Sequence, residues 1–100
     1  MLPARFRDEV AEEVHHAIDY YEADSPTAAR NFEVEFRRIV KEVKEYPQRG
    51  SPTLANARRR RLHGFPYSVV YLVKPDHVYI VAVSHSSQEW GYWVKRLEDQ

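Results

Sequence analysis

Apolar residues recur at the spacing of one helix face near the start of the chain. The residues of this stripe are Val10, Val14, Ala17, Ile18 and Tyr21. They fall at i, i+4, i+7, i+8 and i+11, which is the periodicity of an amphipathic helix. Asp8 is a suitable N-cap, and the glutamates after it suit the positive end of the helix dipole. The pattern predicts a helix from about residue 8 to residue 23.

A second apolar stripe follows after a short break. Its members are Ala29, Phe32, Phe36, Ile39, Val40 and Val43. Ser25 can cap this helix, with Pro26 at its first position, where a missing N–H costs nothing. Pro47 ends it, so the predicted helix runs from residue 26 to about residue 46. Because the connection is short, the two helices are expected to lie antiparallel and side by side.

The second half of the chain changes to the pattern of strands. Residues 47–57 are rich in turn residues and predict a loop. The β-branched and aromatic runs beyond it predict strands at Arg58–His63, Tyr67–Val73 and His77–His85. Their tight connections favour an antiparallel meander, which a short strand at Leu2–Phe6 is able to join. The tail, Gln88–Leu97, is predicted to form a short C-terminal helix.

Helices followed by strands indicate an α+β fold, with two N-terminal antiparallel helices packed on a small antiparallel β-sheet. The expected order is β-α-α-β-β-β with a short C-terminal helix. Both central strands are apolar on both faces. We therefore expect the helix pair to cover one face, while the other needs some cover or a partner. The 100 residues fit a single domain, 1–100.

Composition narrows the classes of function. The chain has no cysteine, which excludes disulfides, cysteine zinc sites and thiol nucleophiles. No run is long and apolar enough for a membrane span, and the N-terminus lacks the apolar stretch of a signal peptide, so a cytoplasmic protein without membrane contact is expected. Neither a cofactor nor a metal is expected. The adjacent His15 and His16 diverge on a helix and have no third ligand at a suitable spacing.

Charge is unevenly distributed, although the net charge is zero. Residues 1–46 carry 7 Lys+Arg against 11 Asp+Glu, whereas residues 47–100 carry 8 against 4. The resulting −4 and +4 indicate that the C-terminal half meets an anionic partner. An acidic solvated helix face beside an ordinary sheet would give the same asymmetry.

Several segments, taken in order, resemble the RelE/ParE family of bacterial toxins over nearly the whole chain. They are Ala17-Ile18-Asp19-Tyr20-Tyr21-Glu22, Ala29-Arg30-Asn31-Phe32, Tyr46-Pro47-Gln48-Arg49-Gly50, Arg58 with Phe65-Pro66-Tyr67-Ser68-Val69-Val70-Tyr71, Ala82-Val83-Ser84-His85, and Tyr92-Trp93 with Arg96. Each segment alone is a weak motif, and their order and spacing make the resemblance specific. The chain is more similar to the ParE and plasmid-stabilisation branch than to the RelE nucleases.

The resemblance implies the toxin of a type II toxin–antitoxin system, with a RelE/ParE-like fold and a cognate antitoxin whose disordered segment folds onto it in a hetero-oligomer. It implies one of two targets: DNA gyrase for ParE-like members, or the ribosome and its mRNA for RelE-like endoribonucleases. The RelE-like cutters use several lysines and arginines in and after the loop behind the second helix. Here residues 47–57 hold only Arg49 and no lysine, which favours gyrase.

Four consecutive arginines, Arg58, Arg59, Arg60 and Arg61, are the most conspicuous candidates for chemistry. On a strand two would point to each face, and four cannot be buried unpaired. Arginine grips planar anions, which suits an RNA backbone or an acidic partner. The alternative is an edge strand kept soluble by its charge. Of the four, Arg58 and Arg59 align best with the arginine of the family.

His85 ends the last predicted strand, where the resemblance places a histidine. Cleavage of RNA by the 2′-OH needs a base, an acid and a cation for the phosphorane. If the chain is a nuclease, the expected catalytic residues are Arg58, Arg59, His85 and Arg96. A histidine that bonds a backbone carbonyl is the competing interpretation, and it is favoured for a ParE-like chain.

Trp90, Tyr92 and Trp93 lie beside Lys95 and Arg96 in the tail. Aromatic side chains among cations suit base stacking, whereas packing over the open sheet face is the plainer interpretation, especially for Trp93. We expect Arg60, Arg61, Trp90, Tyr92 and Trp93 to bind the target or the antitoxin. The function expected from the sequence is growth inhibition through gyrase. The alternatives are a ribosome-dependent mRNA endoribonuclease and a degenerate toxin that serves only as a regulatory binding module.

Overall fold

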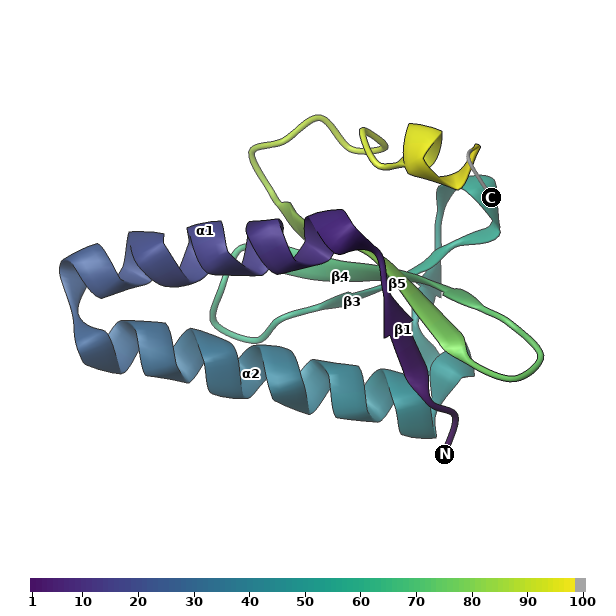
Figure 1. Cartoon of the computed structure of the whole chain (residues 1–100), viewed down its shortest axis with the longest axis horizontal. Coiled ribbons are helices and arrows are strands. Elements are labelled where there is room, and N and C mark those ends of the chain that lie inside the picture. Colours follow the sequence, from purple (N-terminus) through teal and green to yellow (C-terminus); the bar gives the residue numbers. More distant parts are fainter. Residues whose placement is uncertain (99–100) are drawn as a thin grey trace.

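A long helix hairpin forms the first half of the protein. The computed structural model describes residues 1–98, and in it α1 (Asp8–Asp24) and α2 (Pro26–Glu45) run antiparallel and extend beyond one end of the sheet (Figure 1). Both helices predicted from the apolar stripes are confirmed, with ends that differ by one residue from the expectation. None of the helices in residues 1–98 has the length and apolar character that crossing a bilayer requires.

The two helices begin differently. Asp8 is the first residue of α1 and not its cap; the capping position belongs to Arg7, whose side chain makes no capping hydrogen bond, so the expectation for Asp8 is wrong. Arg7 is instead oriented by its bonds to Glu9 and to the Arg96 carbonyl. The cap of α2 is confirmed, because the Ser25 hydroxyl accepts a hydrogen bond from the Ala28 N–H at 3.0 Å.

Replacing Ser25 by alanine should lower the free energy of unfolding by about 1 kcal/mol, the usual value of an N-cap oxygen. Urea unfolding monitored by circular dichroism measures the change. Ser51→Ala is the matched control, since Ser51 is exposed on a short edge strand, and it should change stability by less than about 0.5 kcal/mol. Equal effects of the two substitutions would contradict the capping role.

The second half of the chain forms most of a five-stranded sheet with the order β1-β5-β4-β3-β2. The strands are β1 (Ala4–Phe6), β2 (Ser51–Pro52), β3 (Arg58–Arg61), β4 (Tyr67–Val73) and β5 (Val78–His85). The predicted meander is confirmed for β3 to β5, and β2, which was not predicted, adds a further antiparallel pairing with β3. The predicted loop at 47–57 also holds two 3₁₀ turns and the short β2.

The first strand departs from the expectation of a wholly antiparallel sheet. It pairs parallel with β5, with Ala4 opposite Val78, so the sheet is mixed. Tight turns force neighbouring strands to run antiparallel, but β1 is joined to the sheet through the whole helix hairpin. Its direction is therefore set by where the hairpin returns the chain, which the local pattern does not encode.

One side of the sheet packs against the hairpin and forms the larger core. Its fully buried members are Val10, Ala17, Phe32, Ile39, Val43, Leu62, Val69, Tyr71, Val78, Ile80 and Val83. The Tyr71 hydroxyl ends this core by accepting a hydrogen bond from the Gly50 N–H at 3.1 Å and donating to the Pro47 carbonyl at 2.7 Å. A Cβ atom at Gly50 would lie 2.1 Å from that hydroxyl oxygen, so this contact requires glycine.

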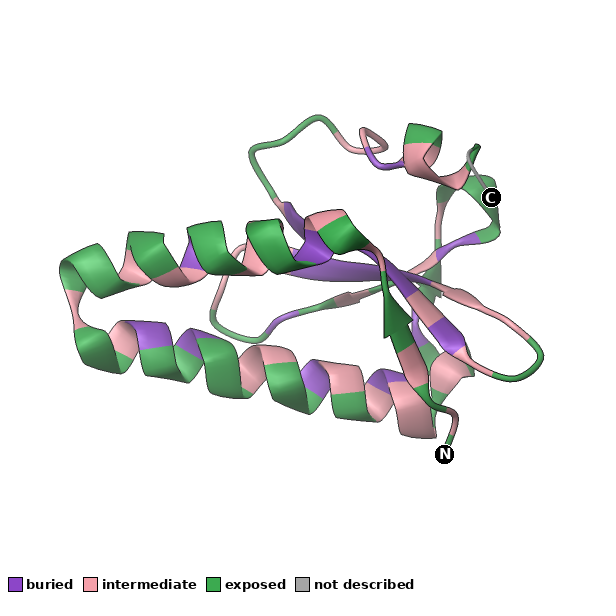
Figure 2. Ribbon diagram, in the orientation of Figure 1, coloured by how far each residue is buried: buried purple, intermediate pink, exposed green. Residues whose placement is uncertain are grey.

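The other side of the sheet is covered by the chain's own tail. Trp93 is fully buried against Val70, Val81 and Ala82, and Figure 1 shows the yellow tail lying across the sheet opposite α2. Val94–Leu97 forms a 3₁₀ turn, which fits the short C-terminal helix that was predicted. Figure 2 shows the central strands buried between these two coverings, with the exposed residues on the outer faces of the helices and in the loops.

Candidate functional site: a cationic pocket and an apolar groove

The strand β3 carries four arginines in succession, and the pleat sends them alternately to the two sides of the sheet. Their partners on β4 identify those sides. Arg58 lies opposite Tyr71 and Arg60 lies opposite Val69, and both partners belong to the core under the hairpin. The second and fourth arginines therefore face the side of the sheet that the tail covers.

The two arginines on the hairpin side are held by internal bonds. Arg58 donates to the carbonyl oxygens of Gln48 and Gly50, at 3.1 Å and 2.7 Å. Arg60 pairs with Glu42 on α2 at 2.6 Å, and this hydrogen bond is the largest cause of the lowered pKa of the Glu42 carboxyl. These contacts attach β3 to the loop before it and to α2. Arg58 and Arg60 therefore stabilise the fold.

A small network continues from this ion pair along α2. Arg38 joins Glu35 and Glu42, and Glu35 also accepts the His63 N–H at 2.6 Å. The Arg38 guanidinium is the largest cause of the lowered pKa of Glu35. The network places carboxylates against the cations on this side of the sheet, which leaves little free positive charge there.

The two arginines on the tail side have no such partners. Arg59 and Arg61 are exposed, and within residues 1–98 neither guanidinium has a hydrogen bond or an ion pair. They line a pocket of about 210 Å³ where β3 and β5 end and β4 begins. The other residues of this pocket, which we call the cationic pocket, are Pro66, Tyr67, Ser68, Ser84, His85, Ser86 and Trp90. No carboxylate is among these lining residues, so its charge is positive.

His85 is held in a defined state at the wall of the cationic pocket. The Ser87 N–H donates to Nδ1 at 2.9 Å, and the Ser87 hydroxyl lies 2.7 Å from the same nitrogen. Because Nδ1 accepts, a neutral ring carries its hydrogen on Nε2, which is therefore a donor. The Tyr67 ring packs edge-on against the imidazole at 4.8 Å. Burial raises the pKa of the Tyr67 hydroxyl, which makes it a poor proton donor or acceptor near neutral pH.

Two more side chains complete the pocket. Trp90 donates its indole N–H to the Thr53 hydroxyl at 2.9 Å, and the Arg59 guanidinium lies 5.2 Å from the centre of the indole ring. Ser84 is 2% exposed, and its hydroxyl oxygen makes no hydrogen bond within the described chain. The Ser84 hydroxyl has only a weak contact with the Tyr92 hydroxyl oxygen, and Tyr92 donates its own hydrogen to Glu13.

The remaining predicted residues of the tail lie away from this pocket. Arg96 reaches α1, where its guanidinium bonds both carboxylate oxygens of Glu13 at 3.1 Å, and it also donates to the Val81 carbonyl at 3.0 Å. The Tyr92 hydroxyl and the Val83 N–H also donate to Glu13. Burial, followed by this bond to Glu13, raises the pKa of Tyr92. The Glu13 carboxylate on α1 thus bonds both the tail and β5 and holds the three segments together.

The structure therefore separates the predicted nuclease set. Of Arg58, Arg59, His85 and Arg96, only Arg59 and His85 share the pocket. Of the predicted binding residues, Arg61 and Trp90 also line it, whereas Trp93 is buried in the second core and Tyr92 and Arg60 make internal bonds. The lining offers donors and positive charge, which suit binding of an anion.

Three residues that the sequence pattern does not single out contribute to this arrangement. Ser87 sets the hydrogen-bonding state of His85, Thr53 fixes Trp90, and Glu13 anchors the tail. The serine two residues after His85 was a local signal, because such side chains often bond a neighbouring ring or backbone. No local pattern points to Thr53 or Glu13, whose partners lie 37 and up to 83 positions away.

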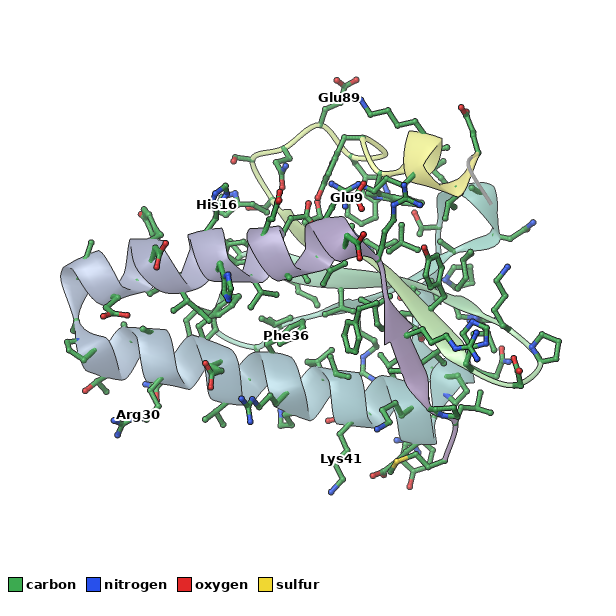
Figure 3. All side chains as sticks on the ribbon, viewed as in Figure 1. Glu9, His16, Arg30, Phe36, Lys41 and Glu89 are labelled. Carbon is green, nitrogen blue, oxygen red and sulfur yellow. The ribbon has the colours of Figure 1, made fainter. Side chains whose placement is uncertain are left out.

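A second surface lies where β1 meets the open end of the hairpin. Two adjoining hollows of about 410 Å³ each share Phe6 and Phe36. Their other apolar lining residues are Met1, Val10, Ala11, Val14 and Val40. Figure 3 shows Phe36 directed from α2 toward α1, while Arg30 and Lys41 point outward from α2. We call this surface the apolar groove; Arg37, Lys41 and Lys44 form a basic rim along it.

Comparisons with known proteins agree with this architecture. The family model described as "ParE toxin of type II toxin-antitoxin system, parDE" matches residues 4–90. Among solved structures, a chain of the "Chromosomal ParDE TA system from P. aeruginosa" superposes with a TM-score of 0.74 at 18% identity, over 85% of this chain and 96% of that one. A search of curated proteins gave no match. At 18% identity, the structural likeness shows a shared fold. The family model matches most of the sequence and therefore shows the family. The chain belongs to the ParE toxin family of type II toxin–antitoxin systems.

Proposed function

We propose that this toxin inhibits growth by binding DNA gyrase and that it does not cleave RNA. The observation that carries the proposal is the internal bonding of Arg58 and Arg96, which removes two of the four groups expected of a nuclease. In the pocket that remains, the hydroxyl beside His85 belongs to Tyr67, and burial raises its pKa, which disfavours proton transfer by that group. Binding to a macromolecule requires exposed charge and a complementary surface and needs no acid or base. The cationic pocket and the apolar groove provide such surfaces.

The apolar groove supports a partner that neutralises the toxin. Phe6 and Phe36 are partly exposed at its floor, and burying them under a peptide would remove apolar surface from water. The basic rim favours acidic residues beside the apolar ones. An antitoxin segment that is disordered alone and folds on binding fits this combination. It would carry apolar side chains for the groove and carboxylates for the rim.

Expression of the chain alone in bacteria tests whether it is a working toxin. We expect growth to stop, and we expect co-expression of the neighbouring reading frame to restore it. Phe36→Asp should weaken that rescue, because it places a charge in the apolar groove. Val34→Asp is the matched control, since Val34 is 61% exposed and lies outside the groove, and rescue should persist. A chain that is harmless when expressed alone would support the regulatory binding module instead.

The RelE-like endoribonuclease is the second candidate, and one observation favours it. Arg59 and His85 share one pocket, which places a cation beside an imidazole. Sequencing of the 5′ ends of ribosome-bound mRNA after expression distinguishes the two. We expect no new cleavage sites; cleavage that depends on His85 would replace gyrase binding as the function.

A further inference from the structure

We propose that the cationic pocket is a phosphate-binding site that takes a backbone phosphate of single-stranded nucleic acid. This goes beyond the proposed function, because it assigns a ligand to the pocket that is independent of gyrase. The first argument is charge. Arg59 and Arg61 stand two residues apart on the same side of β3, so their Cα atoms are separated by about 7 Å. Both guanidinium groups are free to converge on one anion.

The surroundings of these guanidiniums select for an anion. Most arginines of the protein already pair with carboxylates or carbonyls, as Arg58, Arg60 and Arg96 do. The cationic pocket contains no carboxylate that would neutralise its two arginines. Two unpaired guanidiniums that line one pocket repel each other, and a bound phosphate offsets that repulsion while accepting charge-assisted hydrogen bonds.

The neutral donors of the pocket point to the same ligand. The Ser84 hydroxyl lines the pocket, is 2% exposed and has only a weak contact with the Tyr92 hydroxyl, so its hydrogen is available to a stronger acceptor. A phosphate oxygen in the pocket would accept its hydrogen. His85 adds a second neutral donor, because the Ser87 N–H occupies Nδ1 and leaves the hydrogen on Nε2. The pocket thus combines two cations with two donors and presents no anion.

Trp90 makes single-stranded nucleic acid the better fit than an acidic peptide. Its indole lies against the Arg59 guanidinium in the wall of the pocket, and Thr53 fixes its orientation. Bases of unpaired strands stack on aromatic rings and on guanidinium planes, whereas carboxylate side chains have no flat face to stack. A phosphate in the pocket would place the neighbouring base beside this Arg59–Trp90 pair. The bases of a double helix are already stacked inside it, so double-stranded nucleic acid cannot stack a base on the Arg59–Trp90 pair.

Fluorescence anisotropy with short labelled single-stranded RNA and DNA tests the proposal on the purified full chain. We expect Arg61→Ala to weaken binding about tenfold and to reduce the dependence of log K on log salt by about one phosphate contact. Ser84→Ala should weaken binding about threefold, the loss of one neutral hydrogen bond. Arg30→Ala is the matched control: it removes the same charge from an exposed position on α2, and binding should stay within twofold.

Competition measurements and a titration with inorganic phosphate complete the test. Double-stranded DNA and poly-glutamate should compete at least tenfold less well than unlabelled single strands, and the better of the RNA and DNA strands identifies the source of the phosphate. Inorganic phosphate should shift the His85 ring resonances in the wild type and in Arg30→Ala but not in Arg61→Ala. Equal losses for Arg61→Ala and Arg30→Ala would overturn the proposal, as would poly-glutamate that competes as well as the nucleic acid. Thermal unfolding confirms that each variant is folded.

Discussion

Replacing Trp93 by alanine should lower the free energy of unfolding by about 4 kcal/mol, the largest loss that we expect from a single substitution. Trp93 is fully buried and fills the centre of the second core, between the tail and the sheet. The substitution removes this apolar contact and leaves a cavity that a short tail cannot close. Urea unfolding monitored by circular dichroism measures the loss.

Two further variants separate the possible causes. Trp93→Phe keeps most of the buried area and removes the indole N–H, which is buried without a hydrogen bond, so we expect a loss of only about 1 kcal/mol. Leu54→Ala is the control for loss of an apolar side chain, since Leu54 is half exposed, and it should cost less than about 1 kcal/mol. If Trp93→Ala cost no more than this control, the tail would not be part of the folded core.

Replacing Glu13 by alanine should lower the free energy of unfolding by about 3 kcal/mol. This carboxylate accepts hydrogen bonds from the Val83 N–H, the Tyr92 hydroxyl and the Arg96 guanidinium. Both side chains of the ion pair are mostly buried, at 16% exposed for Glu13 and 14% for Arg96. Removing the anion leaves a mostly buried cation and a backbone N–H without their partner, which costs more than the pair itself contributes.

A double-mutant cycle identifies the source of that loss. Arg96→Ala combined with Glu13→Ala should cost less than the sum of the single losses by about 1 to 2 kcal/mol, because each removes the other's partner. Glu12→Ala is the matched control, since Glu12 is the exposed neighbour on α1, and it should stay within about 0.5 kcal/mol. Additive losses would show that Glu13 and Arg96 stabilise the protein independently.

The helix hairpin and the meander followed from the sequence because their determinants are local. The apolar stripe of α2 and the Ser25-Pro26 start encode the helix without reference to the rest of the chain. The direction of β1 depends on where a hairpin of 17 and 20 residues returns the chain, and no residue of β1 records it. The apolar residues on both faces of the central strands predict that the second face must be covered. The sequence also favours Trp93 as a residue that packs over it.

The candidate site could be predicted only in part. Strand alternation implied that two arginines point each way, and the structure has this arrangement. Which pair is free depends on Glu42, 18 positions before Arg60, and on carbonyls of the loop before β3. For this reason the family resemblance favoured Arg58 and Arg59 alike, although Arg58 is internally bonded and Arg59 lines the pocket together with Arg61. Alignment with a family identifies a position, but its chemistry depends on the contacts around it.

The most direct test of the account mixes the purified toxin with DNA gyrase and relaxed plasmid, and in parallel with ribosomes translating a defined mRNA. The account predicts that supercoiling is inhibited in a dose-dependent way and that the mRNA stays intact. Cleaved mRNA together with unimpaired supercoiling would contradict it.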